Sequence, residues 1–264
     1  MPTSQINMHK PTLTKFQKVR KTIQFLLLIA MPVVFAWMSP IVIMIAGFQR
    51  TVNMGMVIFS LWFISSLFLG RSYCSFLCMG GAGQEIFGHL IKKPPIAGPR
   101  KRRRIVRYII FALWLGVILF VPLTNGGFLN INPFFPNDLD GSLPFISIPR
   151  EVSAGLFMYF GMQLLSFVIL THILGNRAFC QFICPISVLG DIGSRIGRIL
   201  HIPGLKLHAE SEKCIQCKEC NHNCQMGIDV CEMAKKKTMI DADCIFCGEC
   251  IDACSRKVIR FKFH

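Results

Sequence analysis

Eight cysteines near the C-terminus occur in two runs that share one spacing. The runs are Cys214, Cys217, Cys220, Cys224 and then Cys244, Cys247, Cys250, Cys254. The pattern Cys-x2-Cys-x2-Cys-x3-Cys is typical of ferredoxins that bind two [4Fe-4S] clusters, in which the fourth cysteine of each run ligates the other cluster. The sequence therefore predicts one cluster on Cys214, Cys217, Cys220 and Cys254. It predicts a second cluster on Cys244, Cys247, Cys250 and Cys224.

Zinc is the alternative metal for closely spaced cysteine pairs. Eight cysteines in two matching runs exceed what one tetrahedral ion needs, so we interpret them as iron–sulfur ligands that serve electron transfer. A proline usually follows the fourth cysteine, and here Gln225 and Ser255 stand in those places. The turn after each fourth cysteine is therefore less constrained than with proline.

Four further cysteines form a repeated motif in the apolar part of the chain. The two copies are Arg71-Ser-Tyr-Cys74-Ser-Phe-Leu-Cys78 and, 106 residues later, Arg177-Ala-Phe-Cys180-Gln-Phe-Ile-Cys184. An internal duplication explains this match, with two helix hairpins that end in the same motif on the same side of a membrane. If the local backbone is helical, a Cys-x3-Cys spacing places both sulfurs on one face.

Several roles are open for these four cysteines. Four convergent thiolates suit an intramembrane iron or iron–sulfur centre. They could instead act as redox-active dithiols, line a quinone pocket, or pack as ordinary small side chains. The duplication favours a metal or redox role. Arg71 and Arg177 either extend to the membrane interface or stabilise a nearby anion, whereas Cys231, outside any ligand spacing, is expected to be a packing residue.

The composition predicts a membrane protein. The 264-residue chain is 52% hydrophobic and has a net charge of +15, a combination that soluble domains seldom show. Four apolar stretches approach the roughly 20 residues that cross a bilayer. They are Ile23–Phe48, Asn53–Gly70, Ile105–Leu123 and Gly155–Gly175.

Basic residues orient these spans. They cluster in the N-terminal arm and in the link between the second and third spans, which holds Lys92, Lys93, the run Arg100–Arg104 and Arg107. The positive-inside rule then places the N-terminus, the 71–104 link and the C-terminal part in the cytoplasm of a bacterial or archaeal cell. We attribute the basic run to topology and lipid contact rather than to nucleic-acid binding.

The predicted fold is mainly α-helical, with three parts. Residues 1–22 form a basic cytoplasmic arm, residues 23–200 a four-helix transmembrane bundle of two repeated hairpins, and residues 201–264 an α+β two-cluster ferredoxin domain. The sequence has no CxxCH haem motif, no Walker loop and no GxGxxG fingerprint, so we expect no c-type haem or nucleotide on this chain. His172 is expected to be a helix-contact residue, and the link at 124–153 is a candidate docking segment or quinol entrance.

These features together resemble the NapH family of membrane iron–sulfur proteins, related to the membrane cores of NosR and CcoG. The resemblance rests on the two Cys-x3-Cys motifs, on the continuations Gly81-Ala82-Gly-Gln84-Glu85 and Cys184-Pro185, and on the ferredoxin runs. The family usually has proline where this chain has Met79. That difference concerns the geometry of the first motif.

The resemblance implies an electron-transfer subunit of a quinol-linked oxidoreductase in the respiratory chain. Such a protein passes electrons between the quinone pool and a redox partner, either a reductase or a ferredoxin-like subunit. The alternative is an assembly factor that reduces a copper ion or thiols. Assembly factors of that kind usually carry a further C-terminal domain, whereas this chain ends at His264, so we expect the subunit role.

Overall fold

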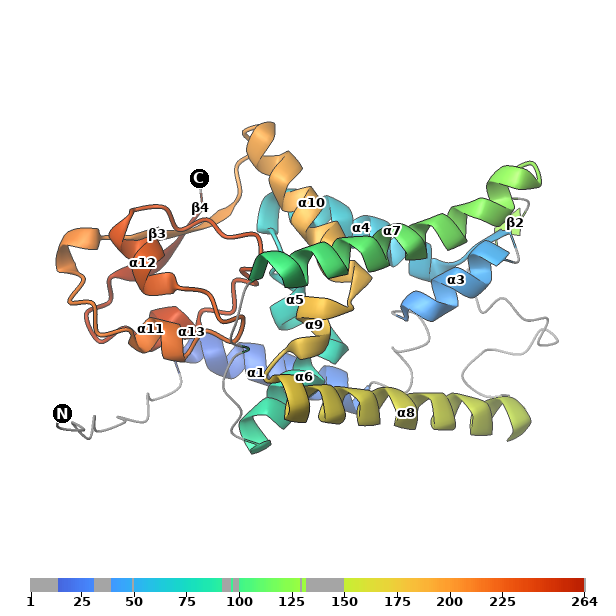
Figure 1. Ribbon diagram of the computed structural model, residues 1–264, viewed down its shortest axis with the longest axis horizontal. Coiled ribbons are helices and arrows are strands. Elements are labelled where there is room, and N and C mark those ends of the chain that lie inside the picture. Colours follow the sequence, from blue (N-terminus) through green and yellow to red (C-terminus); the bar gives the residue numbers. More distant parts are fainter. Residues whose placement is uncertain are drawn as a thin grey trace.

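A computed structural model describes residues 14–30, 39–48, 50–91, 96, 100–128, 130–131 and 150–263. The described chain is mostly helical, with a ferredoxin-type part at its C-terminal end (Figure 1). The helices of the N-terminal three quarters are α1 (Lys15–Ile29), α3 (Pro40–Phe48), α4 (Met54–Leu69), α5 (Tyr73–Phe76), α6 (Met79–Ile91), α7 (Arg100–Thr124), α8 (Arg150–Leu174), α9 (Ala178–Phe182) and α10 (Pro185–Ile199). Most of the predicted 124–153 link lies outside the described residues.

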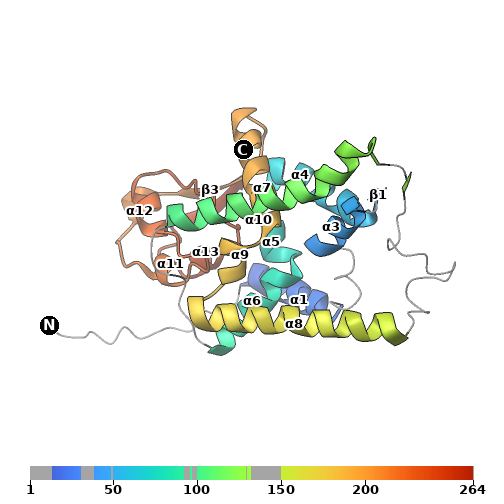
Figure 2. The ribbon, with the colours of Figure 1, turned by 45° about the vertical axis from the view of Figure 1, so that its right-hand side comes forward.

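The long helices α7 and α8 extend away from the ferredoxin-type part in both views (Figure 1 and Figure 2). Helix α3 packs on α7, α10 on α4, and α6 on α8. Two short strands, β1 (Thr51–Val52) and β2 (Asn130–Ile131), pair in parallel near the far end of α3 and α7. Within the described residues, α7 alone is long and apolar enough to cross a membrane, and α4 and Gly161–Leu174 are shorter apolar helices.

The helical part has apolar side chains outside and polar side chains inside. The exposed positions of α4, α7 and α8 include Leu61, Leu113, Phe120, Met162 and Ile173. Helix α1 has the same arrangement, because its buried residues are Gln17, Arg20 and Gln24 while Val19, Leu26 and Ile29 are exposed. Extended apolar surface of this kind marks a membrane or protein interface.

Small residues allow α10 to approach α4 closely. A methyl group at Gly193 would collide with Ser66 Oγ and would lie 3.1 Å from the Phe63 carbonyl oxygen. Glycine at such positions brings two helix backbones together, as in many membrane helix pairs. The close approach fixes the position of α10, and with it the position of Cys184 directly before its first residue.

The ferredoxin-type part consists of a two-stranded antiparallel sheet and short helices. Strand β3 (Leu205–Ala209) pairs in antiparallel register with β4 (Ile259–Phe263), so that Leu207 lies opposite Phe261. Between them lie the 3₁₀ turn η1 (Ser211–Lys213) and helices α11 (Glu219–His222), α12 (Val230–Lys235) and α13 (Glu249–Asp252). Six of the eight cysteines lie in the loops between these elements, and Cys220 and Cys250 lie in α11 and α13.

The N-terminal region differs from the predicted free basic arm. Helix α1 begins at Lys15, inside the range assigned to the arm, and Gln17 donates a hydrogen bond to the Cys247 carbonyl (2.8 Å). The predicted first span is not one helix in the described residues, because α1 ends at Ile29 and α3 begins at Pro40. Polar contacts from α1 therefore join the helices to the ferredoxin-type part.

Arginines at the start of α7 form ion pairs that the sequence analysis did not predict. Arg100 pairs with Asp241 (2.7 Å), Arg104 with Asp243 (2.9 Å), and Arg107 with Asp243 (3.1 Å). Both aspartates precede Cys244 in the sequence. The start of α7 therefore binds the ferredoxin-type part directly, a contact that charge counting alone does not indicate.

Candidate functional site

One cavity of the ferredoxin-type part is lined by the four cysteines that the sequence assigns to one cluster. These are Cys214, Cys217, Cys220 and Cys254, and we call them the first cysteine site. Cys231 lines the same cavity, although the sequence interpretation treated it as a packing residue. The cavity is thus lined by three cysteines of the first run, by the fourth cysteine of the second run and by Cys231.

A second cavity is lined by Cys224, Cys244, Cys247 and Cys250, the second cysteine site. This site faces the helices. Phe246, between two of its cysteines, packs on Gly70 at the end of α4, and the Cys247 carbonyl accepts the hydrogen bond from Gln17. The assignment of each site to a cluster remains a prediction.

The backbone around both sites has matching left-handed residues. Gln216 and Lys218 in the first run have φ of 57° and 62°, and Phe246 and Gly248 occupy the same positions in the second run with φ of 53° and 78°. Alternating left- and right-handed residues turn successive N–H groups toward one point, a concavity that suits anions, including iron–sulfur clusters. Strained non-glycine residues of this kind concentrate at functional sites. The loops therefore fit an anionic cluster.

One thiol of each site, Cys220 in the first and Cys244 in the second, is held in its protonated form by burial. Burial raises the pKa of Cys220 and of Cys244 to about 12. Metal binding must therefore displace these protons, since the thiolate is the ligand. The fourth cysteines are hydrogen-bonded alike, because Cys224 Sγ accepts from Ile228 N and Cys254 Sγ accepts from Val258 N, each at 3.4 Å. The turns after Cys224 and Cys254 therefore have the same hydrogen bond, although Gln225 and Ser255 stand where proline is usual.

The repeated Cys-x3-Cys motifs adopt the same local structure. In each, a short helix ends between the two cysteines and a longer helix begins directly after the second, at Met79 or at Pro185. The turns share a hydrogen bond of 3.0 Å, from Cys78 N to Tyr73 O and from Cys184 N to Phe179 O. The expectation that both sulfurs share one helix face assumed a continuous helix through each motif, and the helix is interrupted in both. Met79 allows the same turn in the first motif as Pro185 does in the second.

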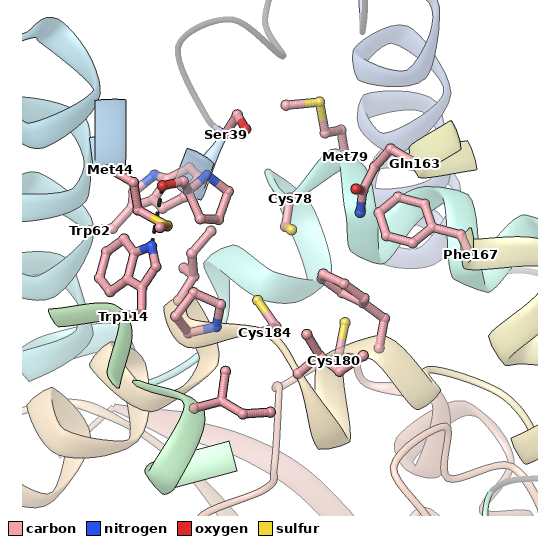
Figure 3. A pocket seen from close by; sticks show the side chains of 17 residues that line it. Ser39, Met44, Trp62, Cys78, Met79, Trp114, Gln163, Phe167, Cys180 and Cys184 are labelled. Atoms are coloured by element: carbon pink, nitrogen blue, oxygen red, sulfur yellow. Dashed lines mark hydrogen bonds between the residues drawn. The ribbon is translucent and has the colours of Figure 1, made fainter. Parts of the chain in front are cut away.

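Cys74, Cys78, Cys180 and Cys184 of these two motifs are called the helical cysteine site, and the last three of them border an apolar cavity of about 270 Å³. Figure 3 shows the sulfur atoms of Cys78, Cys180 and Cys184 directed toward this space. The other walls are mostly aromatic and aliphatic, with Trp62, Trp114, Phe167, Gln163 and Ser39 among them. Cys74 is buried close to Cys78, near enough for their charges to interact. His172 lies on the exposed face of α8, outside this cavity.

Arg177 connects the helical cysteine site to the second cysteine site. Its guanidinium group lies close enough to the thiols of both Cys180 and Cys247 for electrostatic interaction. It donates to Glu85 Oε2 (2.6 Å), to the Cys74 carbonyl (3.2 Å) and to Gln225 Oε1 (2.6 Å). Gln225, the residue that replaces the usual proline, thus holds Arg177 from the ferredoxin side.

Arg71, the counterpart of Arg177 in the first motif, has a corresponding position. It interacts electrostatically with Cys74 and Cys244, and its Nη1 donates to the Ala242 carbonyl (3.0 Å). Its Nε and Nη2 atoms are buried and have no hydrogen-bond partner among the described residues. Buried cationic donors without acceptors are costly, so an anionic group between these cysteines fits this position.

Glu85 neutralises two buried arginines. Arg20 binds both of its carboxylate oxygens (2.9 and 2.7 Å), Arg177 binds Oε2, and Gln24 donates a further bond (3.0 Å). Burial alone would raise the pKa of Glu85, but the neighbouring Arg177 and Arg20 outweigh burial and hold that pKa far below its usual range. Glu85 therefore stays ionised at any physiological pH.

The spacing of the cysteines does not suit a single metal ion. Sulfur ligands of one tetrahedral ion lie about 3.8 Å apart, given metal–sulfur bonds of roughly 2.3 Å. No three cysteine sulfurs among the described residues lie within 4.8 Å of one another. The residues that do converge so closely are Glu85, His89 and Glu249, and Arg20 already forms ion pairs with both glutamates. A multi-iron centre, whose cysteines bind different iron atoms, agrees better with this spacing.

The sequence interpretation quoted Glu85 only as part of the family resemblance, and it did not recognise the matching acid Asp191. Glu85 and Asp191 are separated by the same 106 residues as the cysteines, and Asp191 accepts from Tyr108 (2.6 Å) and Arg195 (3.0 Å). The repeat thus extends from Arg71 to Glu85 and from Arg177 to Asp191. Extending the comparison of the two motifs by seven residues would have found both acids.

Known proteins resemble this chain in the regions just described. A family model described as a 4Fe-4S binding domain matches residues 53–96 and residues 157–203. Each matched segment contains one Cys-x3-Cys motif and the helices before and after it. No solved structure matches the chain significantly.

Curated relatives point the same way. YccM of Escherichia coli strain K12, provisionally named an electron transport protein, is 21% identical over 75% of this chain and 53% of its own length. The ferredoxin-type protein NapH of the same strain is 22% identical over 71% of this chain and 60% of its length. NapH of Haemophilus influenzae is 28% identical over 39% of this chain and 36% of its length. The chain thus spans only part of the relatives that it matches.

Proposed function

We propose that the chain is a NapH-type iron–sulfur electron-transfer protein that sits in the cytoplasmic membrane and passes electrons between the quinone pool and a redox partner protein. The proposal rests above all on one observation. The two repeated arginines, Arg71 and Arg177, each interact electrostatically with a cysteine of the helical cysteine site and with a cysteine of the second cysteine site. This arrangement joins an apolar cavity among the helices to a ferredoxin-type part.

Membrane insertion is proposed from the surface of the helices. Apolar side chains cover the outside of α4, α7 and α8, while arginine, glutamate and glutamine lie inside. Polar groups inside a membrane protein face its interior and tend to be functional. We propose four spans over the predicted segments, with both ends of the chain and the ferredoxin-type part in the cytoplasm, as the basic residues before α7 favour.

Three sets of cysteines would hold iron–sulfur clusters. The first and second cysteine sites would each hold a [4Fe-4S] cluster. The helical cysteine site, Cys74, Cys78, Cys180 and Cys184, would hold a third centre at one end of the apolar cavity. When bound, these clusters supply one-electron redox chemistry. The helix N-termini directly after Cys78 and Cys184 favour the negative charge of such a centre.

The apolar cavity is the proposed quinone site. A cavity of about 150 Å³ is known to hold benzene, so about 270 Å³ leaves room for a larger quinone ring system. Aromatic walls from Trp62, Trp114 and Phe167 suit ring stacking. Gln163 and Ser39 supply the few polar groups that orient a ligand in such a pocket. Oxidation of a quinol there releases two electrons and two protons.

The partner is proposed to dock near the first cysteine site. Helices α11 and α12 lie toward the end of the molecule opposite to the direction in which α7 and α8 extend (Figure 1). The backbone turn at Cys217 is exposed, as are Lys218, Arg256 and Lys257. A positively charged surface around an exposed redox site steers negatively charged proteins toward it. The partner would therefore be an acidic redox protein.

Quinol-driven reduction tests this proposal. Full-length protein, purified anaerobically in lipid nanodiscs, is mixed with a reduced naphthoquinol, and the reduced clusters are followed by EPR; dithionite serves as a quinone-independent reductant. We expect Gln163→Trp, which fills the cavity, to slow quinol reduction at least tenfold while dithionite still reduces the clusters. The control Met162→Trp, on the exposed face of α8, should behave as the native protein. Equal quinol rates for all three proteins, or no quinol reduction of the native protein, would contradict the proposal.

A further inference from the structure

Cys231 is held beside the first cysteine site by a short hydrogen-bond chain. Asn221, which directly follows Cys220, accepts from Cys231 N (2.7 Å) through its Oδ1 and donates to Asp229 Oδ1 (2.8 Å) through its Nδ2. Asp229 also caps helix α12 by accepting from Glu232 N (3.0 Å). The first turn of α12 is thereby fixed against the first cysteine run.

The side chain of Cys231 lines the cavity of the first cysteine site together with its four predicted ligands. Its thiol is close enough to both Cys214 and Cys220 for their charges to interact. The cavity of the second cysteine site is lined by its own four cysteines and by no fifth cysteine of the described chain. The two halves of the ferredoxin-type part are therefore unequal at this point.

The position of Cys231 is better explained by a role as a metal ligand than by packing alone. A [4Fe-4S] cluster binds one cysteine at each of its four irons, so five thiols around one cavity exceed the requirement by one. The extra thiol, Cys231, is buried beside Cys214, whereas Cys217 is exposed. Cys231 therefore lies where a sulfur atom must lie if it is to replace Cys214 as a ligand.

We propose that Cys231 is a reserve ligand of the first cysteine site, able to replace Cys214. The exchange is balanced without an oxidant or reductant. The bond from iron to Cys214 breaks and that thiolate takes up a proton, while the Cys231 thiol gives up its proton and binds the same iron. This proposal rests on the proposed function, since it requires that the first cysteine site hold a cluster. Its consequence is that the site tolerates loss or chemical modification of Cys214.

Iron analysis of anaerobically purified full-length variants tests the proposal. The variants are Cys214→Ala, Cys217→Ala, Cys231→Ala and the double variant Cys214→Ala/Cys231→Ala. We expect Cys214→Ala and Cys231→Ala to keep the native content of iron and acid-labile sulfide. We expect Cys217→Ala and the double variant to lose about four irons or to convert the cluster to a three-iron form. EPR of the reduced proteins should also show a changed signal for Cys214→Ala, because a different thiolate then binds the cluster.

The outcomes separate this inference from the proposed function. If Cys214→Ala loses as much iron as Cys217→Ala, Cys231 is not a reserve ligand, and the cluster assignment itself stands. If no variant changes the iron content, the first cysteine site holds no cluster, and both proposals fail. Circular dichroism of each variant checks that the helices remain folded, so that iron loss reports on ligation.

Discussion

The buried carboxylate of Glu85 offers the sharpest test of how the helices hold the ferredoxin-type part. Its partners Arg20 and Arg177 are both 0% exposed, and Glu85 itself is 2% exposed. Glu85→Gln would remove the carboxylate that Arg177 binds and would leave Arg20 with Glu249 as its remaining carboxylate partner. Breaking a buried ion pair by removing one partner costs about 3–5 kcal/mol. For a chain of this size, each kcal/mol lowers the melting temperature by about 2–4 °C, so we expect a fall of about 6–20 °C.

The assay is thermal unfolding of the purified protein in detergent, followed by circular dichroism, with Glu232→Gln as the matched control. Glu232 pairs with Lys236 on the surface (3.1 Å) and is 50% exposed, so its loss should cost about 0.5 kcal/mol or less. The low pKa of Glu85 adds a pH dependence. Its stabilisation is fully present above its unfolded pKa of about 4.3 and is lost as the pH falls below that value. The difference between native protein and Glu85→Gln should therefore be constant from pH 5 to 7. A melting temperature for Glu85→Gln within 2 °C of the control would refute the reasoning.

Three further variants test individual contacts, each measured as the free energy of unfolding in denaturant. Gln225→Pro, which restores the usual family residue, should cost about 1.5–3 kcal/mol because it removes the buried hydrogen bond to Arg177, whereas Ser255→Pro at the matching exposed position should cost little. Gly193→Leu should cost about 1–3 kcal/mol through overpacking of α10 on α4, and Gly116→Leu, with open space around it, should be nearly neutral; equal effects would contradict the packing described. Asp229→Ala should cost about 1 kcal/mol through loss of the α12 cap. Hydrogen bonds from Glu232 N and Asn221 lower the pKa of Asp229, so this cost should shrink as the pH falls below about 4; a cost that does not change with pH would contradict the cap.

Much of the ferredoxin-type part could be predicted from its sequence. Cysteine spacing is a direct consequence of cluster geometry, so the grouping of Cys254 with the first run, and of Cys224 with the second, was available from the pattern alone. The segments of α4, α7 and α8 could likewise be predicted, because long apolar stretches have few structural alternatives. The predicted resemblance to NapH proteins is confirmed, since NapH proteins of two bacteria match the chain.

The polar network between the two parts could not be predicted in the same way. Arg20 and Arg100 appeared as members of basic runs, and charge counting assigns such residues to solvent or lipid. Their real partners, Glu85, Glu249 and Asp241, are distant in sequence, and single-chain patterns do not specify which distant charges meet. The position of Cys231 was missed for a similar reason, since its proximity to Cys214 depends on the fold of α12 rather than on spacing.

The central claim, that cysteines among the helices hold an iron–sulfur centre linked to the ferredoxin-type part, is tested most directly by the iron and acid-labile sulfide content of the anaerobically purified protein. The variant for comparison carries serine at Cys74, Cys78, Cys180 and Cys184. The two cysteine sites of the ferredoxin-type part account for about eight irons. We predict that the native protein contains clearly more than eight irons and that the variant falls to about eight. A content of about eight in both proteins would contradict the claim and leave these four cysteines without an iron–sulfur centre.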